Sequence, residues 1–498
     1  MKIKLYAALF LVVALLATML TGCGDGNGPA TDPVTDPVTD PVGPDDQLTL
    51  TLAEKFGTRD YNGTSLMFLV GANTGWWVSY DIAGPVESGE ILSEALFKRN
   101  ADISATFDVN INYEGKPFAQ TVNALKKDVM AEDNYYDSFF AAGQHLSKVV
   151  TNQLAVNLND IEGFDFSDPW WNETVNKDLN FGGEYRPFAM GDMNIMAWKA
   201  TSAVMYNYTL GNNEGVEDCF ELVRNNKWTM DKWNQLARDF ALDYDLDGIM
   251  DWDRDRYGIV CGSQSFEYSL NGMGETLAAK DGEGWPSVFT LSDRSINALE
   301  KITDHYSKLN TLNVHDTSYS NGTSLAGKSG KLFAEGRFLF FSETICGSFQ
   351  LWDMEDDYGF LPFPKYDENQ ENYNASIQTS QLSVVTIPVL ADERLTEVVD
   401  VINAMGYLNM RDVKDVFFNS VFGTRSVRDD NSIEMLKIIL QDRTFDLGVC
   451  LNFGDLATQL RTTAILGTNA YASTYESYLG AAKEGCADFI DALKENNQ

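Results

Sequence analysis

Apolar and polar positions follow two alternating periods along this chain, and these periods predict strands and helices in turn. Short apolar runs indicate strands, whereas apolar positions three or four residues apart indicate helices. The first region contains predicted strands over 65–70, 108–113 and 135–140, and predicted helices over 88–107 and 119–132. Farther along, we expect a strand over 257–261 and helices over 230–242, 293–309, 392–409, 431–440 and 470–493. This alternation predicts an α/β fold with a mostly helical C-terminal third.

Side chains that can cap helices support these boundaries. Ser88, Thr229 and Ser292 each stand directly before an apolar-periodic segment, where a hydroxyl oxygen can accept a bond from the first turn. Trp228 and Trp233 flank or lie inside the helix that Thr229 begins, and we expect both to be core residues.

Composition sets limits on size and partners. The chain has 498 residues, of which 44% are hydrophobic, enough for two or three domains or one large bilobed body. Its formal net charge is −36, and this becomes −38 when a segment containing Lys2 and Lys4 is removed. Such a surface repels nucleic acid, so no nucleic-acid partner is expected.

Cysteine and histidine usage gives no sign of catalysis. Of six cysteines, Cys23 lies near the start, and the other five form no C-x-x-C pair. Buried thiols are therefore expected, although one bridge, such as Cys450 to Cys486, stays open. The three histidines are scattered, and the chain lacks H-E-x-x-H, G-x-S-x-G and P-loop motifs. We predict a non-enzyme with no catalytic residues and no catalytic cofactor.

The N-terminus has the pattern of an export signal. A basic start and an apolar run over 5–20 lead into Leu20-Thr21-Gly22-Cys23, which resembles a bacterial lipobox. That resemblance implies a signal peptide over 1–22, acyl chains such as palmitate on Cys23, and a position on the extracellular face of the cell membrane. The alternative is an ordinary export signal with a chance cysteine. Three Thr-Asp-Pro-Val copies over 31–42 predict an unpacked tether over 23–47.

An acidic loop is the sharpest local chemical signal. Its carboxylates and glycine follow the spacing of a calcium loop, because hard Ca²⁺ needs several converging oxygens and a sharp turn. The predicted metal ligands are Asp243, Asp245, Asp247, Ile249 through its backbone carbonyl, Asp251 and Asp255. Arg254 stands where a closing glutamate is expected, so Asp255 would have to close the site. A structural Ca²⁺ is predicted, and a loop of solvated aspartates is the alternative.

Tryptophans outside periodic helices suggest sugar stacking. Aromatic faces pack on the apolar faces of sugar rings, while polar side chains bind hydroxyl groups. Trp76 and Trp77 precede Tyr80 in one loop, Trp170 and Trp171 form a second pair, and Trp285 follows a glycine-containing loop. The alternative for any single tryptophan is a place in the core.

The chain resembles the extracellular solute-binding lipoproteins of ABC importers, specifically the carbohydrate-associated group 1 proteins. The matching segments run along the whole chain and include 96–100, 135–137, 169–171, 191–192, 204–207, 227–231, 255–258, 336–341, 358–365 and 445–448. One departure is Tyr206-Asn207-Tyr208, where the family usually has Asn-Lys.

This resemblance implies two α/β lobes joined by a hinge with crossings near 197–202, 357–363 and 410–416. Lobe 1 would comprise 48–200 and 358–412, and lobe 2 would comprise 201–357 and the helical segment 413–498. A small-molecule solute, most simply a carbohydrate, would bind between the lobes and pass to an ABC permease. The implied ligand-binding residues are Trp76, Trp77, Tyr80, Asp137, Trp170, Trp171, Asp192, Trp285 and Glu343.

Two other functions are weighed against this one. A surface glycan-binding or sensory lipoprotein would bind the same ligand without its own permease. A surface glycosidase would need a pair of catalytic carboxylates. With 73 acidic residues in the chain, some pair always looks plausible, so the sequence gives this alternative no positive support. The sequence leaves the identity of the solute open.

Overall fold

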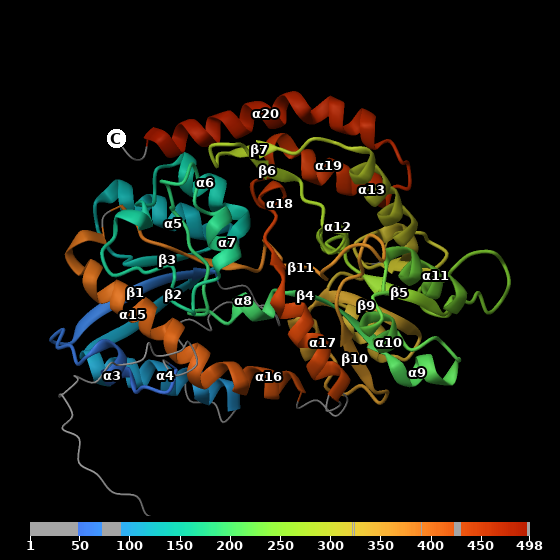
Figure 1. The fold of residues 1–498 in the computed structure, drawn as a ribbon, viewed down its shortest axis with the longest axis horizontal. Helices are drawn as coiled ribbons and strands as arrows, with labels where there is room; N and C mark the ends of the chain where they lie inside the picture. Colours follow the sequence, from blue (N-terminus) through green and yellow to red (C-terminus); the bar gives the residue numbers. More distant parts are fainter. Residues whose placement is uncertain are drawn as a thin grey trace, which may run out of the picture. The chain divides into compact units, whose positions relative to one another are not determined.

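The computed structural model describes residues 48–71, 91–320, 322, 324–389, 391–422 and 430–495, all within one compact unit, Pro44–Gln498. The predicted signal peptide, Cys23, the tether and the Ser88 cap lie outside the described residues. Two α/β lobes make up the described body (Figure 1). None of its described helices combines the length and apolar character needed to cross a membrane.

Lobe 1 is built on a four-stranded sheet in the order β12-β3-β1-β2. β1 is parallel to β2 and β3, and β12 is antiparallel to β3. The strands are β1 (Thr64–Gly71), β2 (Val109–Lys116), β3 (Ser138–Ala142) and β12 (Ser383–Thr386), and the helices are α3 (Leu52–Phe56), α4 (Ile91–Phe107), α5 (Phe118–Ala131), α6 (Leu146–Thr151), α7 (Glu173–Asp178) and α15 (Leu395–Leu408). Leu66, Phe68 and Val70 of β1 face one core, and Leu69 faces the other. Helices therefore cover both faces of this sheet.

Lobe 2 is built on a five-stranded sheet in the order β10-β4-β9-β5-β8. β5, β8 and β9 run parallel, whereas β4 and β10 run antiparallel to their neighbours. The strands are β4 (Ser202–Asn207), β5 (Tyr257–Cys261), β8 (Thr311–Asn313), β9 (Phe338–Thr344) and β10 (Tyr358–Leu361), and the helices are α9 (Tyr208–Asn213), α10 (Cys219–Arg224), α11 (Met230–Phe240), α12 (Ser265–Gly272), α13 (Asp293–His305), α14 (Ser329–Ala334) and α17 (Asp430–Gln441).

The helix caps follow the sequence pattern. The side chain of Thr229 accepts a bond from Lys232 N at the start of α11, and Ser292 does the same for Ser295 N at α13. Trp228 and Trp233 are fully buried and pack against each other and Phe340, which confirms their core role.

Three chain segments meet at the hinge. The first follows α8 (Met196–Lys199), the second contains β11 (Ala375–Ser376), and the third contains β13 (Arg443–Thr444). β11 pairs in parallel with β13, Gln378 N donates to Ala200 O at 2.9 Å, and Ile377 N donates to Thr444 O at 2.9 Å. These backbone bonds fix the direction in which the chain passes between the lobes.

The second crossing lies later than the sequence predicted. β10 pairs with β4 inside the lobe 2 sheet, so residues 358–375 stay in lobe 2 and the chain enters lobe 1 only at β12. The prediction that lobe 1 resumes at 358 is therefore wrong. Before it reaches β13, the chain leaves lobe 1 through α16 (Lys414–Phe422), which packs against α4 and also against the 3₁₀ helix η5 (Ile345–Gln350) that follows β9.

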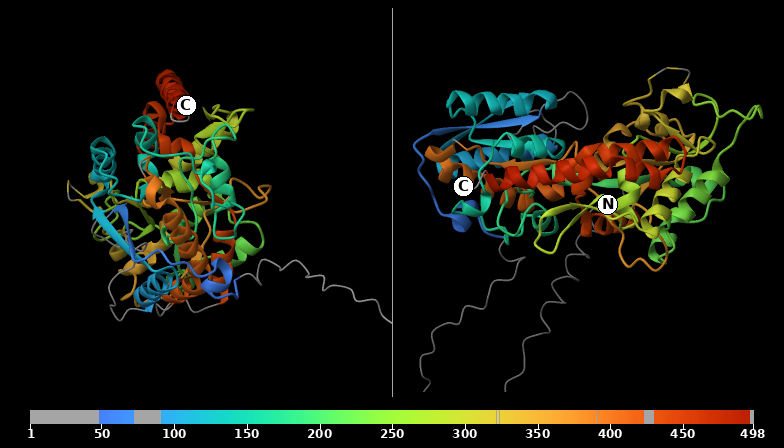
Figure 2. Two further views of the ribbon diagram at one scale, coloured as in Figure 1. Left: turned by 90° about the vertical axis from the view of Figure 1, so that its left-hand side faces the viewer. Right: turned by 90° about the horizontal axis from the view of Figure 1, so that it is seen from above.

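The C-terminal helices link the two lobes. α18 (Leu447–Leu451), α19 (Leu456–Ile465) and α20 (Tyr471–Glu495) follow the hinge, and α20 runs across both lobes (Figures 1 and 2). α20 packs on α19, on α6 and on the hairpin of β6 (Ala278–Lys280) and β7 (Pro286–Val288). The ring of Phe489 lies edge-on to Phe181 with centroids 5.4 Å apart, and it also contacts Phe453.

The described cysteines are all free and buried. Cys450 donates its thiol to Gly143 O at 2.8 Å, and Cys486 donates to Pro286 O at 3.0 Å. The bridge between Cys450 and Cys486 that the sequence left open does not form.

Phe489→Ala should lower the free energy of unfolding by about 3 kcal/mol, because the substitution removes a fully buried ring between Phe181 and Phe453. Urea denaturation followed by tryptophan fluorescence measures this change. Asp488→Ala, at an exposed position one residue earlier in α20, is the matched control and should stay within about 0.5 kcal/mol of the parent. Equal stability of the two variants would contradict the assignment of α20 to the core.

Candidate ligand-binding cleft

The candidate site lies where strands of both sheets end. β3 is followed by Gly143-Gln144, and β5 is followed by Gly262-Ser263-Gln264. In α/β folds, ligands bind outside the carboxyl ends of the strands. Two cavities open at this edge, each with a volume of about 400 Å³. They share the lining residues Gln144, Gln264, Gln378 and Ser380, so they form two compartments of one cleft.

The first compartment, which we call the Glu343 compartment, is rich in uncharged polar groups. It is lined among others by Phe118, Gln144, Gln264, His315, Glu343 and Gln381. Its four glutamines come from three places, namely the end of β3, the end of β5 and the second hinge segment. Amide groups both donate and accept hydrogen bonds, which suits a ligand with many hydroxyl groups.

Glu343 reaches this compartment from β9, where it lies opposite Ala203 of β4. Its Oε1 atom accepts a bond from Thr344 N at 3.0 Å. Burial raises the pKa of the Glu343 carboxyl to about 7, and the bonds from Thr344 oppose that rise only in part. Glu343 is the one predicted ligand-binding residue that the described structure brings to the cleft.

His315 enters the same compartment directly after β8. Its Nδ1 atom accepts a bond from Ser263 N at 3.0 Å, so the neutral ring carries its proton on Nε2. Burial lowers the pKa of His315, and Arg461 lowers it further. The ring is therefore neutral near pH 7, with Nε2–H as its remaining donor.

The second compartment, the Arg461 compartment, contains a partly buried ion pair. Arg461 Nη1 donates to Glu267 Oε1 at 2.6 Å. Burial raises the pKa of Glu267 to about 7, although Arg461 opposes the rise. Glu267 Oε2, Tyr268 OH and Gln378 Oε1 are buried with no hydrogen-bond partner among the described residues. Polar atoms of this kind need a partner from ligand or solvent.

Asp446 is the other carboxylate of this compartment, and it is fully engaged by the protein. It accepts bonds from Leu277 N, Asn271 Nδ2 and Gly448 N at 2.8 to 3.1 Å. Burial raises its pKa, and these donors oppose that rise. Its role is to hold α12 and the hairpin strand β6 against the start of α18.

Two predicted carboxylates lie away from the cleft lining. Asp137 precedes β3, whereas the cleft lies at the other end of that strand. Its carboxylate accepts bonds from Met67 N at 2.6 Å and Arg394 Nε at 2.5 Å, which pins β1 and η6 (Ala391–Arg394) to the start of β3. Asp192 accepts a bond from Trp198 Nε1 at 2.9 Å near the first hinge segment, and burial raises its pKa.

The tryptophans predicted to stack on a ligand occupy other places. Trp170 is 1% exposed between Phe56 and Tyr407, and Trp171 is 5% exposed against Phe164 and Phe166. Both rings are covered, which corrects the expectation that they present faces to a sugar. Trp285 packs on Tyr185 and under the ammonium group of Lys494, so it helps to join the β6–β7 hairpin to lobe 1 and α20. Trp76, Trp77 and Tyr80 lie outside the described residues.

Sequence reasoning missed the glutamines and His315. A signal was present, because both Gly143-Gln144 and Gly262-Ser263-Gln264 directly follow buried strands, where cleft residues are expected. Gln378 and Gln381 frame a second polar run, Gln-Thr-Ser-Gln, before the buried strand β12.

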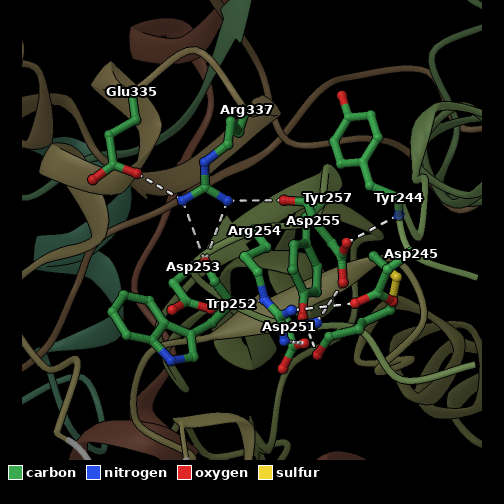
Figure 3. A network of polar contacts seen from close by, with 11 residues as sticks. Tyr244, Asp245, Asp251, Trp252, Asp253, Arg254, Asp255, Tyr257, Glu335 and Arg337 are labelled. Carbon is green, nitrogen blue, oxygen red and sulfur yellow. Dashed lines mark hydrogen bonds and ion pairs between the residues drawn. The ribbon is translucent and has the colours of Figure 1, made fainter. Parts of the chain in front are cut away.

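The acidic loop lies in lobe 2, away from the cleft, and Figure 3 shows its polar network. Carboxylate oxygens of Asp243, Asp245 and Asp247 lie within 4.8 Å of one another, close enough to share a cation. Asp255 instead accepts bonds from Tyr244 N at 3.0 Å and Asp251 N at 2.6 Å. Its carboxylate is thus committed to the backbone, which disagrees with the closing role predicted for it.

Arg254 brings a positive charge to the same loop. Its guanidinium contacts Asp245 Oδ2 at 3.2 Å and also pairs with Asp251 (Figure 3). The Arg254 side chain is largely exposed, so it can leave these carboxylates without disrupting the core. The side chain of Ile249 is exposed, and its backbone N donates to Asp247 Oδ1 at 2.8 Å.

Comparisons with known proteins support the architecture. No protein-family model matches the sequence, and no curated protein matches it. A cyclo/maltodextrin-binding protein solved with maltotetraose aligns with a TM-score of 0.54 and 12% identity over 88% of this chain and 98% of its own. An ABC substrate-binding protein from Listeria monocytogenes in complex with cycloalternan aligns with a TM-score of 0.52 and 11% identity over 87% of this chain and 99% of its own.

A cyclic alpha-maltosyl-1,6-maltose binding protein from Arthrobacter globiformis gives a TM-score of 0.52 and 13% identity over 87% of this chain and all of its own. At such identities the likeness concerns the fold. The chain therefore has the bilobed α/β fold of periplasmic-type solute-binding proteins.

Proposed function

We propose that this protein captures a polyhydroxylated solute, most simply a sugar or oligosaccharide, between its lobes and delivers it to an ABC importer permease. The observation that carries the proposal is the cleft at the carboxyl ends of both sheets, lined by four glutamines and the neutral His315. Structural neighbours that bind maltotetraose and cycloalternan support the choice of carbohydrate. Trp76, Trp77 and Tyr80 stay part of the proposal as stacking residues.

Binding and closure follow from where these groups are attached. Gln144 belongs to lobe 1, Gln264 and His315 belong to lobe 2, and Gln378 belongs to the hinge. A ligand that bonds to all of them gains more contacts when the lobes approach one another. It can then shift the lobes toward a closed state by its greater affinity for that state.

Saccharides should raise the thermal unfolding midpoint of the body from residue 48 onward, because binding only to the native state stabilises it. Gln264→Ala, which removes an amide shared by both compartments, should weaken binding about tenfold or more. Differential scanning fluorimetry with mono- and oligosaccharides followed by calorimetry measures both effects. Gln120→Ala, at an exposed position on α5, is the control and should leave the affinity unchanged.

No saccharide-dependent shift in the parent protein would remove the support for carbohydrate binding. Equal weakening by Gln264→Ala and Gln120→Ala would place the ligand outside this cleft. Cleavage of the bound saccharide would favour the enzyme alternative instead.

We also propose that Cys23 carries the lipid that holds the protein at the extracellular face of the cell membrane. The sequence Leu20-Thr21-Gly22-Cys23 supports this anchor, and the repeats over 31–42 would supply a spacer.

Cys23→Ser should release the exported protein from the membrane, since the serine lacks the thiol that accepts the lipid. Fractionation of cells that express the parent and the variant, with radiolabelled palmitate as a tracer, measures the change. Cys486→Ser, which removes a buried thiol far along the chain, is the matched control and should stay labelled and bound to the membrane. Retention and labelling of Cys23→Ser would refute this anchor.

A structural Ca²⁺ in the acidic loop is a further part of the proposal. Asp243, Asp245 and Asp247 fit a shared cation, with the carbonyl of Ile249 as a backbone ligand and Asp251 once Arg254 moves aside. The described position of Asp255 assigns it to the backbone rather than to the metal.

Calcium should stabilise the parent against unfolding, by about 2.7 kcal/mol at a concentration one hundred times the dissociation constant. Asp243→Asn should abolish most of this effect, and Arg254→Ala should tighten calcium binding because it removes the competing guanidinium. Thermal melts in calcium and in chelator measure these changes, with Asp239→Asn on exposed α11 surface as control. Identical melts of the parent with and without calcium would contradict the calcium site.

A further inference from the structure

We propose that the Glu343 compartment binds a solute bearing an ammonium group, so that the preferred ligand is an amino sugar or another amine-bearing polyol. This inference rests on the proposed function, because it names the chemical class of solute that the same cleft prefers. It depends on which cations and hydrogen-bond donors surround the carboxylate of Glu343, compared with those that surround the other carboxylates of the cleft.

The Glu343 carboxylate is held in place but left unneutralised. A side chain at Gly347 would approach Glu343 Cγ to 2.6 Å, so the stem of Glu343 is confined between β9 and η5. Oε1 accepts a bond from Thr344 N. In the part of the chain that the structure describes, no group donates to Oε2, which remains available to a ligand in the compartment.

Within the described part of the chain, no basic side chain pairs with this carboxylate. Among the described residues that line the compartment, none is lysine or arginine, and none of the described ion pairs includes Glu343. Since the described lining offers no cation to Glu343, a ligand in the compartment is the direct source of one.

The Arg461 compartment supplies an internal comparison. Glu267 is neutralised there by Arg461 at 2.6 Å, and Asp446 receives several donors from Leu277, Asn271 and Gly448. The protein thus supplies a cation to Glu267 and several donors to Asp446, although Glu267 Oε2 has no hydrogen-bond partner among the described residues. Glu343 instead has a single backbone donor on Oε1 and no paired cation among the described residues, which is the arrangement expected of a receptor for a cationic group.

The other titratable groups around Glu343 supply no positive charge to pair with it. Burial raises the pKa of the Cys261 thiol on β5 and of the Tyr268 phenol on α12, so both stay protonated near pH 7. Burial lowers the pKa of His315 after β8, so this ring is neutral. Burial of a lone carboxylate is costly, and a ligand ammonium offsets that cost where a neutral hydroxyl offsets less.

The test compares three probes by calorimetry at pH 7 in 150 mM salt, which screens long-range attraction to the acidic surface. The probes are a glucosamine trimer, the N-acetylglucosamine trimer and maltotriose. The parent should bind the glucosamine trimer about tenfold or more tightly than either neutral probe. Glu343→Gln should abolish this preference, because the amide keeps the shape but loses the charge.

Two further variants keep the result interpretable. Glu343→Asp retains the charge and should retain part of the preference, even if its overall affinity falls. Glu300→Gln, at an exposed position on α13, removes the same charge outside the cleft and should leave the preference unchanged. Thermal melts of each variant confirm that the comparison is made on folded protein.

Each outcome separates this inference from the proposed function. Tighter binding of a neutral probe, or an amine preference that survives in Glu343→Gln, would overturn the inference and leave saccharide binding intact. Binding of none of the three probes would overturn the inference together with the carbohydrate proposal.

Discussion

The close approach of β3 to the second hinge segment is the constraint on which the cleft depends. A Cβ atom at Gly143 would lie 2.6 Å from Thr379 O, so only glycine lets the two backbones meet. Gly143 N donates to Leu382 O, and Gln144 N donates to Thr379 O, both at 3.3 Å. Because the backbone is fixed here, Gln144 is carried to the boundary that both compartments share. A single small residue thus joins the lobe 1 sheet, the hinge and the binding surface.

Buried carboxylates show where the cleft is rigid and where it is open to a ligand. Asp446 accepts several donors and Glu267 pairs with Arg461, and these bonds hold α12, α18 and α19 around the Arg461 compartment. Glu343 receives a single backbone donor from Thr344 N. Burying a carboxylate without a compensating charge or hydrogen bond is unfavourable, so such a group is expected where a bound ligand supplies that partner. Preorganised polar groups on strand ends also spare a ligand part of the entropy cost of ordering them.

Local patterns in the sequence predicted most elements, because the spacing of apolar residues and the capping side chains determine where helices and strands form. β5 matches its predicted range, and the hydroxyls of Thr229 and Ser292 cap the helices expected after them. The strand predicted over 135–140 begins only at Ser138. Asp137 therefore lies before the strand, and not at the end where a ligand was expected to bind. At the strand's start Asp137 binds Met67 N and Arg394, far along the strand from the cleft. The second crossing was misplaced for a similar reason, because pairing of β10 with β4 depends on contacts distant in sequence.

The tryptophan pair shows why exposure could not be inferred from adjacency. In a strand, neighbouring side chains point to opposite faces, so one of two adjacent tryptophans should face outward. Trp170 and Trp171 instead follow a turn, in which Trp171 N donates to Asp168 O and Trp170 O accepts from Asp192 N. That backbone path lets both rings enter the same core. The Trp170 ring packs so closely on Gly406 that a Cβ atom there would lie 2.6 Å from Trp170 Cδ1.

The glutamines of the cleft could be recognised from their positions in the fold, but not from their residue type. Amides are common on surfaces and have no distinctive spacing, so their number alone indicates nothing. Position supplies the information: Gln144 and Gln264 each follow a buried parallel strand of a different lobe, and Gln378 lies in the segment that joins those lobes. Since the two sheets present these ends toward one cleft, the same few side chains would serve both recognition of the solute and approach of the lobes in the function proposed above.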